Sequence, residues 1–119
     1  MQHFTNLKAW DKGHRLCLAV FKATEPFPPE ERFGLSRQIR RAAISVCSNI
    51  AEGCGRRGDR EFARFLQMSM GSASELEYQL LLARDLAFLS VQAYGALLEA
   101  LSEVKRMLMG LMKKLRAEV

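Results

Sequence analysis

The sequence predicts an all-α protein, an antiparallel up-down-up-down four-helix bundle with left-handed packing. Apolar residues recur at alternating spacings of three and four in four separate segments, and no β-type alternation of useful length competes with this pattern. Short loops join the segments, which favours antiparallel neighbours, and a period of about 3.5 residues is typical of left-handed, coiled-coil-like packing. We therefore expect one domain over residues 1–119, large enough to bury a core.

The first two predicted helices are separated by a proline-rich loop. The inner stripe of the first helix consists of Leu7, Trp10, His14, Cys17 and Phe21, so His14 is expected to be a core histidine. Thr5 or Asn6 is a suitable N-cap, and the segment Glu25–Pro29 ends this helix because proline cannot continue it. A loop through residues 32–34 follows, and Ser36 is the expected N-cap of a second helix that runs to the glycines at 53 and 55.

The third and fourth predicted helices follow the glycine-rich turn at residues 53–58. Asp59 and Ser90 are their expected N-caps. The stripe of the third helix is Phe62, Leu66, Ser69, Ala73, Leu76, Leu80, Ala83 and Ala87. That of the fourth is Leu97, Leu101, Val104, Leu108, Leu111 and Leu115. Other apolar residues fall outside both stripes and predict a second apolar face and self-association: Leu81, Leu82, Leu86, Phe88, Leu98, Met107, Met109 and Met112.

A polar stripe runs along the second helix, at Gln38, Arg41, Ser45, Asn49, Glu52 and Arg56. Buried polar groups are costly unless they are partnered, so this stripe is either an internal network or a surface that meets something else. In a hairpin around residues 53–58, Ser45 faces Ser72, and Arg41 can reach Glu75. We expect a buried structural network of Gln38, Arg41, Ser45, Asn49, Glu52, Ser72 and Glu75. Gly71 is expected to allow close packing of the two helices, since a mid-helix glycine is otherwise unfavourable.

The excess positive charge is confined to one segment. The net charge is +5, and between Arg32 and Arg64 eight arginines face three acids, 8 − 3 = +5, so the rest of the chain is neutral. Arginine presents a planar fork suited to phosphate and carboxylate, which makes an anionic partner one interpretation and a salt-bridged surface the other.

The remaining features predict no catalytic site, no metal site and no cofactor. His3 and His14 have no metal-ligand spacing, and Glu52 lacks a second carboxylate at a useful offset for acid–base chemistry. The cysteines at 17, 47 and 54 are odd in number and lie in apolar patterns, so they are expected in the core and in a reducing compartment. With no signal pattern and no membrane-spanning run, the expected location is cytoplasmic.

Residues 38–45 (QIRRAAIS), 48–53 (SNIAEG) and 55–56 (GR) together form a specific motif. On this motif the sequence resembles the family of small bacterial four-helix-bundle proteins named for intervening sequences in 23S rRNA genes, and the resemblance covers almost the whole chain. Shorter matches are residues 7–10 (LKAW), 27–28 with Glu31, 33–35 (FGL), 61–62, 65–66, 71–72 and 75–76. Ser69 departs from the alanine expected before the Gly-Ser pair.

This resemblance implies a four-helix bundle and a homopentamer, but no established activity. It also implies a structural relative, the accessory protein of diversity-generating retroelements, a basic pentameric barrel that binds nucleic acid and a reverse transcriptase.

The function expected from these features is that of a non-enzymatic oligomer that binds the backbone of RNA or DNA. The candidate phosphate-binding residues are Arg37, Arg40, Arg56, Arg57, Arg60 and Arg64. No exposed aromatic residue is expected among them, so base stacking is not expected, and binding should be poorly sequence-specific and salt-dependent. The alternative is a structural or adaptor oligomer that binds a protein partner and no nucleic acid, with the arginines serving subunit contacts.

Overall fold

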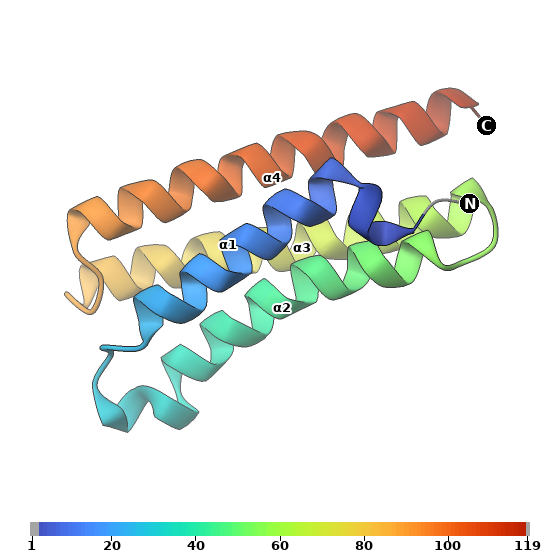
Figure 1. Cartoon of the computed structure of the whole chain (residues 1–119). Coiled ribbons are helices and arrows are strands. Elements are labelled where there is room, and N and C mark those ends of the chain that lie inside the picture. Colours follow the sequence, from blue (N-terminus) through green and yellow to red (C-terminus); the bar gives the residue numbers. More distant parts are fainter. Residues whose placement is uncertain (1–2, 119) are drawn as a thin grey trace.

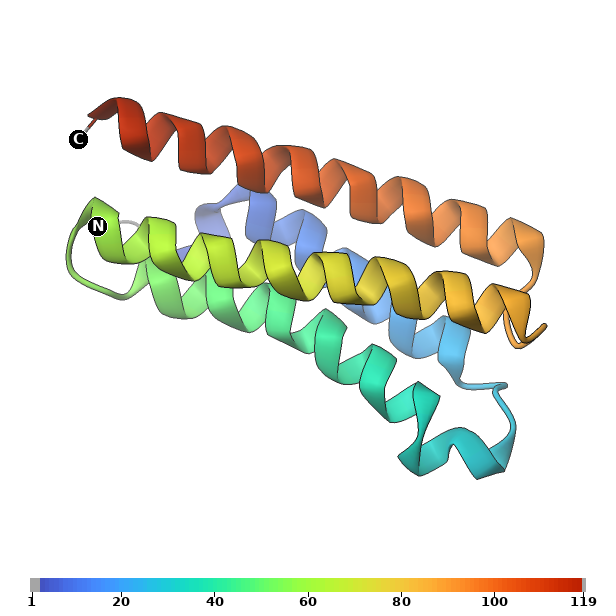
Figure 2. The same cartoon turned by 180° about the vertical axis from the view of Figure 1, so that it is seen from behind.

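The protein is an elongated bundle of four long helices, as a computed structural model that describes residues 3–118 shows (Figure 1). The elements in order are the 3₁₀ turn η1 (Phe4–Asn6), α1 (Lys8–Thr24), the 3₁₀ helix η2 (Pro29–Phe33), α2 (Leu35–Cys54), α3 (Gly58–Asp85) and α4 (Val91–Glu118). Successive helices run in opposite directions along a molecule that measures 46 × 23 × 20 Å (Figures 1 and 2). The predicted all-α four-helix fold is confirmed, and the left-handed sense stays a prediction.

The core lies along the bundle axis, where the inner stripes of the helices meet. α1 contacts α2 and α4, and α3 contacts the same two helices, with the most extensive contact between α2 and α3. Ile39, Leu66, Leu76 and Leu101 are fully buried there. The stripes predicted for α3 and α4 are buried, apart from Phe62 and Leu111, which are partly buried. Ala87 is also an exception, since it lies beyond the end of α3 at a φ of 62°. No helix within residues 3–118 is long and apolar enough to cross a membrane.

The inner face of α1 differs from the predicted stripe. Its buried residues are Ala9, Gly13, Leu16, Val20 and Thr24. His14 is therefore not a core histidine: its ring is exposed and stacks on Trp10 at 4.9 Å with 7° between the planes. The reason is that small side chains allow α1 to approach α2, and a Cβ added at Gly13 would lie 3.3 Å from the Cys47 Sγ.

Three of the four predicted N-caps are wrong. Leu7, Gly34 and Arg57 occupy the N-cap positions of α1, α2 and α3, without a side-chain cap. At α2 the Leu35 N–H donates instead to the Glu31 Oε1 of η2 at 3.2 Å, which satisfies a donor that the helix leaves free. Ser90 does cap α4, because its Oγ accepts a hydrogen bond from the Ala93 N–H at 3.0 Å.

Two glycines have roles other than those predicted. Gly53 lies inside α2 and is buried, and a Cβ there would come within 2.6 Å of the Phe65 Cβ on α3. It is a close-packing residue rather than a helix end. Gly71 is exposed, and an added Cβ would meet nothing within 4 Å, so the packing role predicted for it is wrong.

The apolar residues outside the stripes are divided between core and surface. Leu86 and Met109 are exposed, whereas Phe88 and Met107 pack against the core and Phe88 lies 5.5 Å from the Phe27 ring. Other large apolar side chains at the surface are Leu18, Met68, Tyr78 and Val91. Of the eight residues predicted to form a second apolar face, two are exposed and six are partly buried, so that face is seen only in part. Self-association stays a prediction.

Candidate nucleic-acid interface

The six candidate arginines lie at two opposite ends of the bundle. Arg37 and Arg40 are in the first turns of α2, whereas Arg56, Arg57, Arg60 and Arg64, hereafter the turn arginines, surround the connection from α2 to α3. α2 has 20 residues, which corresponds to about 30 Å. The structure therefore does not bring the six together on one arginine-rich face.

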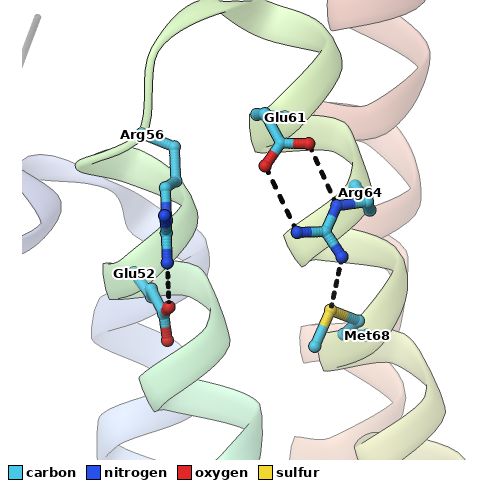
Figure 3. Close-up of polar contacts among 5 residues, drawn as sticks. All are labelled: Glu52, Arg56, Glu61, Arg64 and Met68. Atoms are coloured by element: carbon cyan, nitrogen blue, oxygen red, sulfur yellow. Dashed lines mark hydrogen bonds and ion pairs between the residues drawn. The ribbon is translucent and has the colours of Figure 1, made fainter.

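Two of the turn arginines are already paired with carboxylates of the same chain. Arg56 Nη2 lies 2.6 Å from Glu52 Oε2, and the guanidinium of Arg64 donates to both oxygens of Glu61 at 3.0 and 3.2 Å (Figure 3). The hydrogen bond from Arg64 lowers the pKa of Glu61. Both guanidinium groups also lie over the ring of Phe65, at 5.0 and 4.9 Å from its centre.

The other two turn arginines are unpaired within residues 3–118, but the turn as a whole carries little net charge. Arg57 and Arg60 are exposed and make no ion pair or hydrogen bond with any residue that the structure describes. With Asp59 beside them and the two paired acids included, the turn has four cations and three anions, 4 − 3 = +1.

The opposite end of the bundle contains a cationic groove. Figure 2 shows the start of α2 and η2 lying away from α3 and α4, with the end of α1 beside them. A groove of about 950 Å³, hereafter the groove, lies between these three elements. Its lining residues are Phe21, Lys22, Thr24, Glu25, Phe27, Pro28, Pro29, Arg32, Phe33, Ser36, Arg37, Arg40, Arg41 and Ile44.

The charge of the groove is positive. Five cations and one acid, Glu25, line it, 5 − 1 = +4. Glu30 and Glu31 are nearby on η2, and counting them as well leaves 5 − 3 = +2. Arg40 is held in place without a carboxylate: its Nε donates to Thr24 Oγ1 at 2.8 Å, and its Nη2 donates to the Phe21 carbonyl at 3.1 Å. The groove therefore carries a larger excess of positive charge than the turn.

Aromatic side chains are exposed among these cations, contrary to the expectation from the sequence. Phe33 is 77% exposed, and Phe21 is 36% exposed. The Arg32 guanidinium lies 5.8 Å from the centre of the Phe33 ring, and that of Arg40 lies 4.7 Å from the Phe21 ring. The expectation failed because it placed Phe21 on the buried stripe of α1 and gave the loop residue Phe33 no position.

The sequence analysis missed three groove cations, Lys22, Arg32 and Arg41. Lys22 lies on α1 and Arg32 on η2, and their side chains line the groove beside α2 because residues 25–34 fold back on its first turns. Arg41 was placed in the internal network instead. The dipeptide Arg32-Phe33 between prolines and a glycine is the one local signal that could have indicated this surface.

Comparison with known proteins identifies the family. The family model described as 23S rRNA-intervening sequence protein matches residues 5–110. The chain belongs to this family. Its fold is similar to that of a Bacteroides thetaiotaomicron protein with unknown function, which is described as from the S23 ribosomal protein family and whose crystal structure is known. The two share 23% sequence identity with a TM-score of 0.82, over 88% of this chain and 95% of the other. No match was found among curated proteins.

The motif that carries the resemblance to the 23S rRNA-intervening sequence family is partly a helix-packing motif. Ser45 and Ser72 are hydrogen-bonded at 2.7 Å, as predicted, and the Asn49 Nδ2 donates to the carbonyl and the Oγ of Ser45. Ser69, where the family pattern suggests alanine, is fully buried, and its Oγ donates to the Val46 carbonyl at 2.7 Å. The bonds of Ser72 and Ser69 join α3 to α2, whereas those of Asn49 lie within α2.

The predicted buried pair Arg41–Glu75 is wrong. Both residues are exposed, and neither makes an ion pair or hydrogen bond with another described residue. Gln38 and Glu52 are exposed as well, so they do not belong to an internal network. The network contracts to the serines and Asn49 because longer side chains at its ends reach solvent, where their charge is hydrated at no cost.

The cysteines are less uniformly buried than expected. Cys54 is buried, but Cys17 and Cys47 are half-buried, and their thiols meet across α1 and α2. A hydrogen bond from the Cys47 thiol lowers the pKa of Cys17 to about 7, and the same bond, with burial, raises the pKa of Cys47.

Proposed function

We propose that this protein is a non-enzymatic oligomer that binds the backbone of RNA or DNA through its arginines. The observation that carries this proposal is the groove, in which five cations converge against one acid. Guanidinium groups match phosphate oxygens geometrically, and neutralising phosphates releases condensed counterions, which is a favourable contribution at low salt.

Within this proposal, the groove supplies the main contacts and the turn supplies auxiliary ones. Arg37 and Arg41 are exposed and free of carboxylate partners among the described residues, so binding a phosphate breaks no existing ion pair. Binding at Arg56 or Arg64 would have to displace Glu52 or Glu61. That competition leaves Arg57 and Arg60 as the available contacts of the turn.

The oligomeric part of the proposal rests on the exposed apolar side chains and on family membership. Symmetry would repeat the groove in each subunit, and linked weak sites on one nucleic-acid strand bind far more tightly than one site alone. The charged surface of one chain is modest, so such repetition is what would give useful affinity at physiological salt.

The test is a binding titration with fluorescein-labelled 20-nucleotide RNA and DNA, followed by anisotropy at 50 and 200 mM salt. The wild type should bind at 50 mM and weaken markedly at 200 mM. A variant with Arg32→Gln, Arg37→Gln and Arg41→Gln should bind weakly, and the slope of log affinity against log salt should fall by about two, since each lost phosphate contact contributes about 0.7.

The control removes the same charge elsewhere. Lys113, Lys114 and Arg116 are exposed near the end of α4, at the opposite end of the bundle from the groove (Figure 1). Changing all three to glutamine should leave most of the affinity and the slope intact. Absence of binding at 50 mM salt, or binding that is unchanged at 200 mM, would contradict the proposed function.

A second candidate function is a structural or adaptor oligomer that binds a protein partner. The pairing of Arg56 with Glu52 and of Arg64 with Glu61 favours it, because these arginines serve the chain itself. Charge reversal at Arg57, Arg60 and Arg64 separates the two functions. Loss of assembly favours the adaptor, and an intact assembly with weakened nucleic-acid binding favours the first proposal.

A further inference from the structure

The exposed ring of Phe33 projects from a hydrogen-bonded segment rather than from a loose loop. Phe27, just before η2, is buried, and within η2 the Glu31 N–H donates to the Pro28 carbonyl at 2.9 Å. The Gly34 N–H donates to the Glu31 carbonyl at 3.0 Å, and the Glu31 carboxylate joins η2 to the start of α2 through Leu35. The segment that carries Phe33 is thus bonded on both sides of the ring, which nevertheless projects into solvent.

The Phe33 ring lies in the groove beside both apolar and cationic side chains. Phe21 and Ile44 (45% exposed) also line it, and guanidinium groups lie over both phenylalanine rings. Aromatic faces and guanidinium planes are the surfaces on which unpaired bases stack, and cations beside them neutralise the adjoining phosphates. A surface for phosphate alone would need the cations and not the exposed ring.

The combination of exposed aromatic rings and cations favours single strands over duplexes. In a duplex the base faces are covered by their neighbours, so only phosphate and groove edges are available to the protein. A groove of about 950 Å³ is within the size range of pockets that enclose small ligands, roughly 300–1,000 Å³, so it has room for a short unpaired stretch.

We infer that the groove between α1, η2 and α2 binds single-stranded nucleic acid, with one base stacked on Phe33 and the neighbouring phosphates on Arg32, Arg37 and Arg41. This inference rests on the proposed function and adds to it the class of ligand and the residue that selects it. Stacking is tolerant of sequence because every base has a flat face, so little base preference is expected.

The experiment compares single-stranded and duplex oligonucleotides of equal length, in the full chain at 50 mM salt, with Phe33→Leu as the test variant. Leucine keeps an apolar side chain at this exposed position but removes the flat ring. Single-strand affinity should fall about five- to a hundred-fold, the size of one lost stacking contact, with duplex affinity and the salt slope unchanged. Phe33→Trp should retain single-strand affinity.

His14→Leu is the matched control, because His14 carries an exposed ring but lies on α1 outside the groove. It should leave single-strand affinity intact. The melting temperature of each variant checks that the fold is unaffected, as exposure of both rings leads us to expect.

Four results would overturn the inference, and the last of them would also overturn the proposed function. If Phe33→Leu and the wild type bind the single strand with equal affinity, Phe33 makes no stacking contact, and the proposed function stands. Equal weakening for duplex and single strand would show that Phe33 supports the groove only in general. Equal binding of polyglutamate of matched charge would show that the groove recognises charge alone. If no oligonucleotide binds at 50 mM salt, the proposed function itself fails and the inference fails with it.

Discussion

At the residue scale, single side chains behave according to their immediate contacts rather than their place in a pattern. Arg40 and Arg41 are adjacent in the sequence, yet Arg40 is bonded to Thr24 and the Phe21 carbonyl, whereas Arg41 is exposed and unpaired among the described residues. Consecutive positions on a helix point about 100° apart, so neighbours meet different surroundings. Residue types alone could therefore not assign the two arginines to separate roles.

The thiol contact between α1 and α2 leads to a prediction about pH. Because the Cys47 thiol donates to Cys17 and lowers its pKa to about 7, the rate of Cys17 alkylation by iodoacetamide should rise with pH to a plateau, with its midpoint near 7. Cys47→Ala should move the midpoint up towards the ordinary thiol value of about 8.5. Mass spectrometry of peptides after timed alkylation measures both rates.

Cys54 provides the internal reference for that measurement. It is buried, and burial raises its pKa, so it should react slowly throughout the same pH range. A wild-type midpoint for Cys17 at the ordinary value, unaltered in Cys47→Ala, would contradict the thiol hydrogen bond.

At the scale of the elements, the contact between α2 and α3 is the most extensive in the bundle and depends on small residues. Ser45, Ser69 and Ser72 exchange hydrogen bonds across it, and Gly53 allows α3 to approach the last turn of α2. Helical periodicity in the sequence predicted the pairing of Ser45 with Ser72, because register between two antiparallel helices follows from the position of their turn.

Two glycine substitutions test this contact with opposite expected signs. Gly53→Ala places a Cβ 2.6 Å from the Phe65 Cβ, so it should lower the free energy of unfolding by about 1–3 kcal/mol through overpacking. Gly71→Ala adds a methyl group to open space in a helix and should raise it by up to about 1 kcal/mol.

Urea unfolding followed by circular dichroism, at one fixed protein concentration, measures both effects. The fixed concentration matters because assembly would itself stabilise the folded chain. Equal free energies of unfolding for Gly53→Ala and Gly71→Ala would show that α2 and α3 can move apart at Gly53 without loss of stability.

At the scale of the whole molecule, the four helices leave exposed apolar side chains that a lone bundle does not need. Tyr78 and Val91 are 62% and 73% exposed, and Tyr78 lines a shallow hollow of about 340 Å³ with Leu81 and Tyr94 on α3 and α4. Exposed apolar residues of this size are typical of interfaces when they are contiguous.

We predict that the native protein is a homo-oligomer, and the family resemblance implies five subunits. Native mass spectrometry should give a multiple of the protomer mass, and Tyr78→Lys should shift it towards the protomer. Gln92→Lys is the control, since Gln92 is also exposed but polar, so the same added charge should leave the mass unchanged. A wild-type protomer mass at micromolar concentration would contradict the oligomer.

The sequence by itself determined the four helices, their approximate ends and the contact between Ser45 and Ser72, because helical periodicity and turn residues are local properties that survive into the fold. Only the tertiary structure decided which cations converge. Lys22, Arg32 and Arg37 meet because residues 25–34 fold back onto α2, while about 30 Å of α2 separates them from the turn arginines. The exposure of Phe33 has the same origin, since only the packing of η2 leaves its ring in solvent.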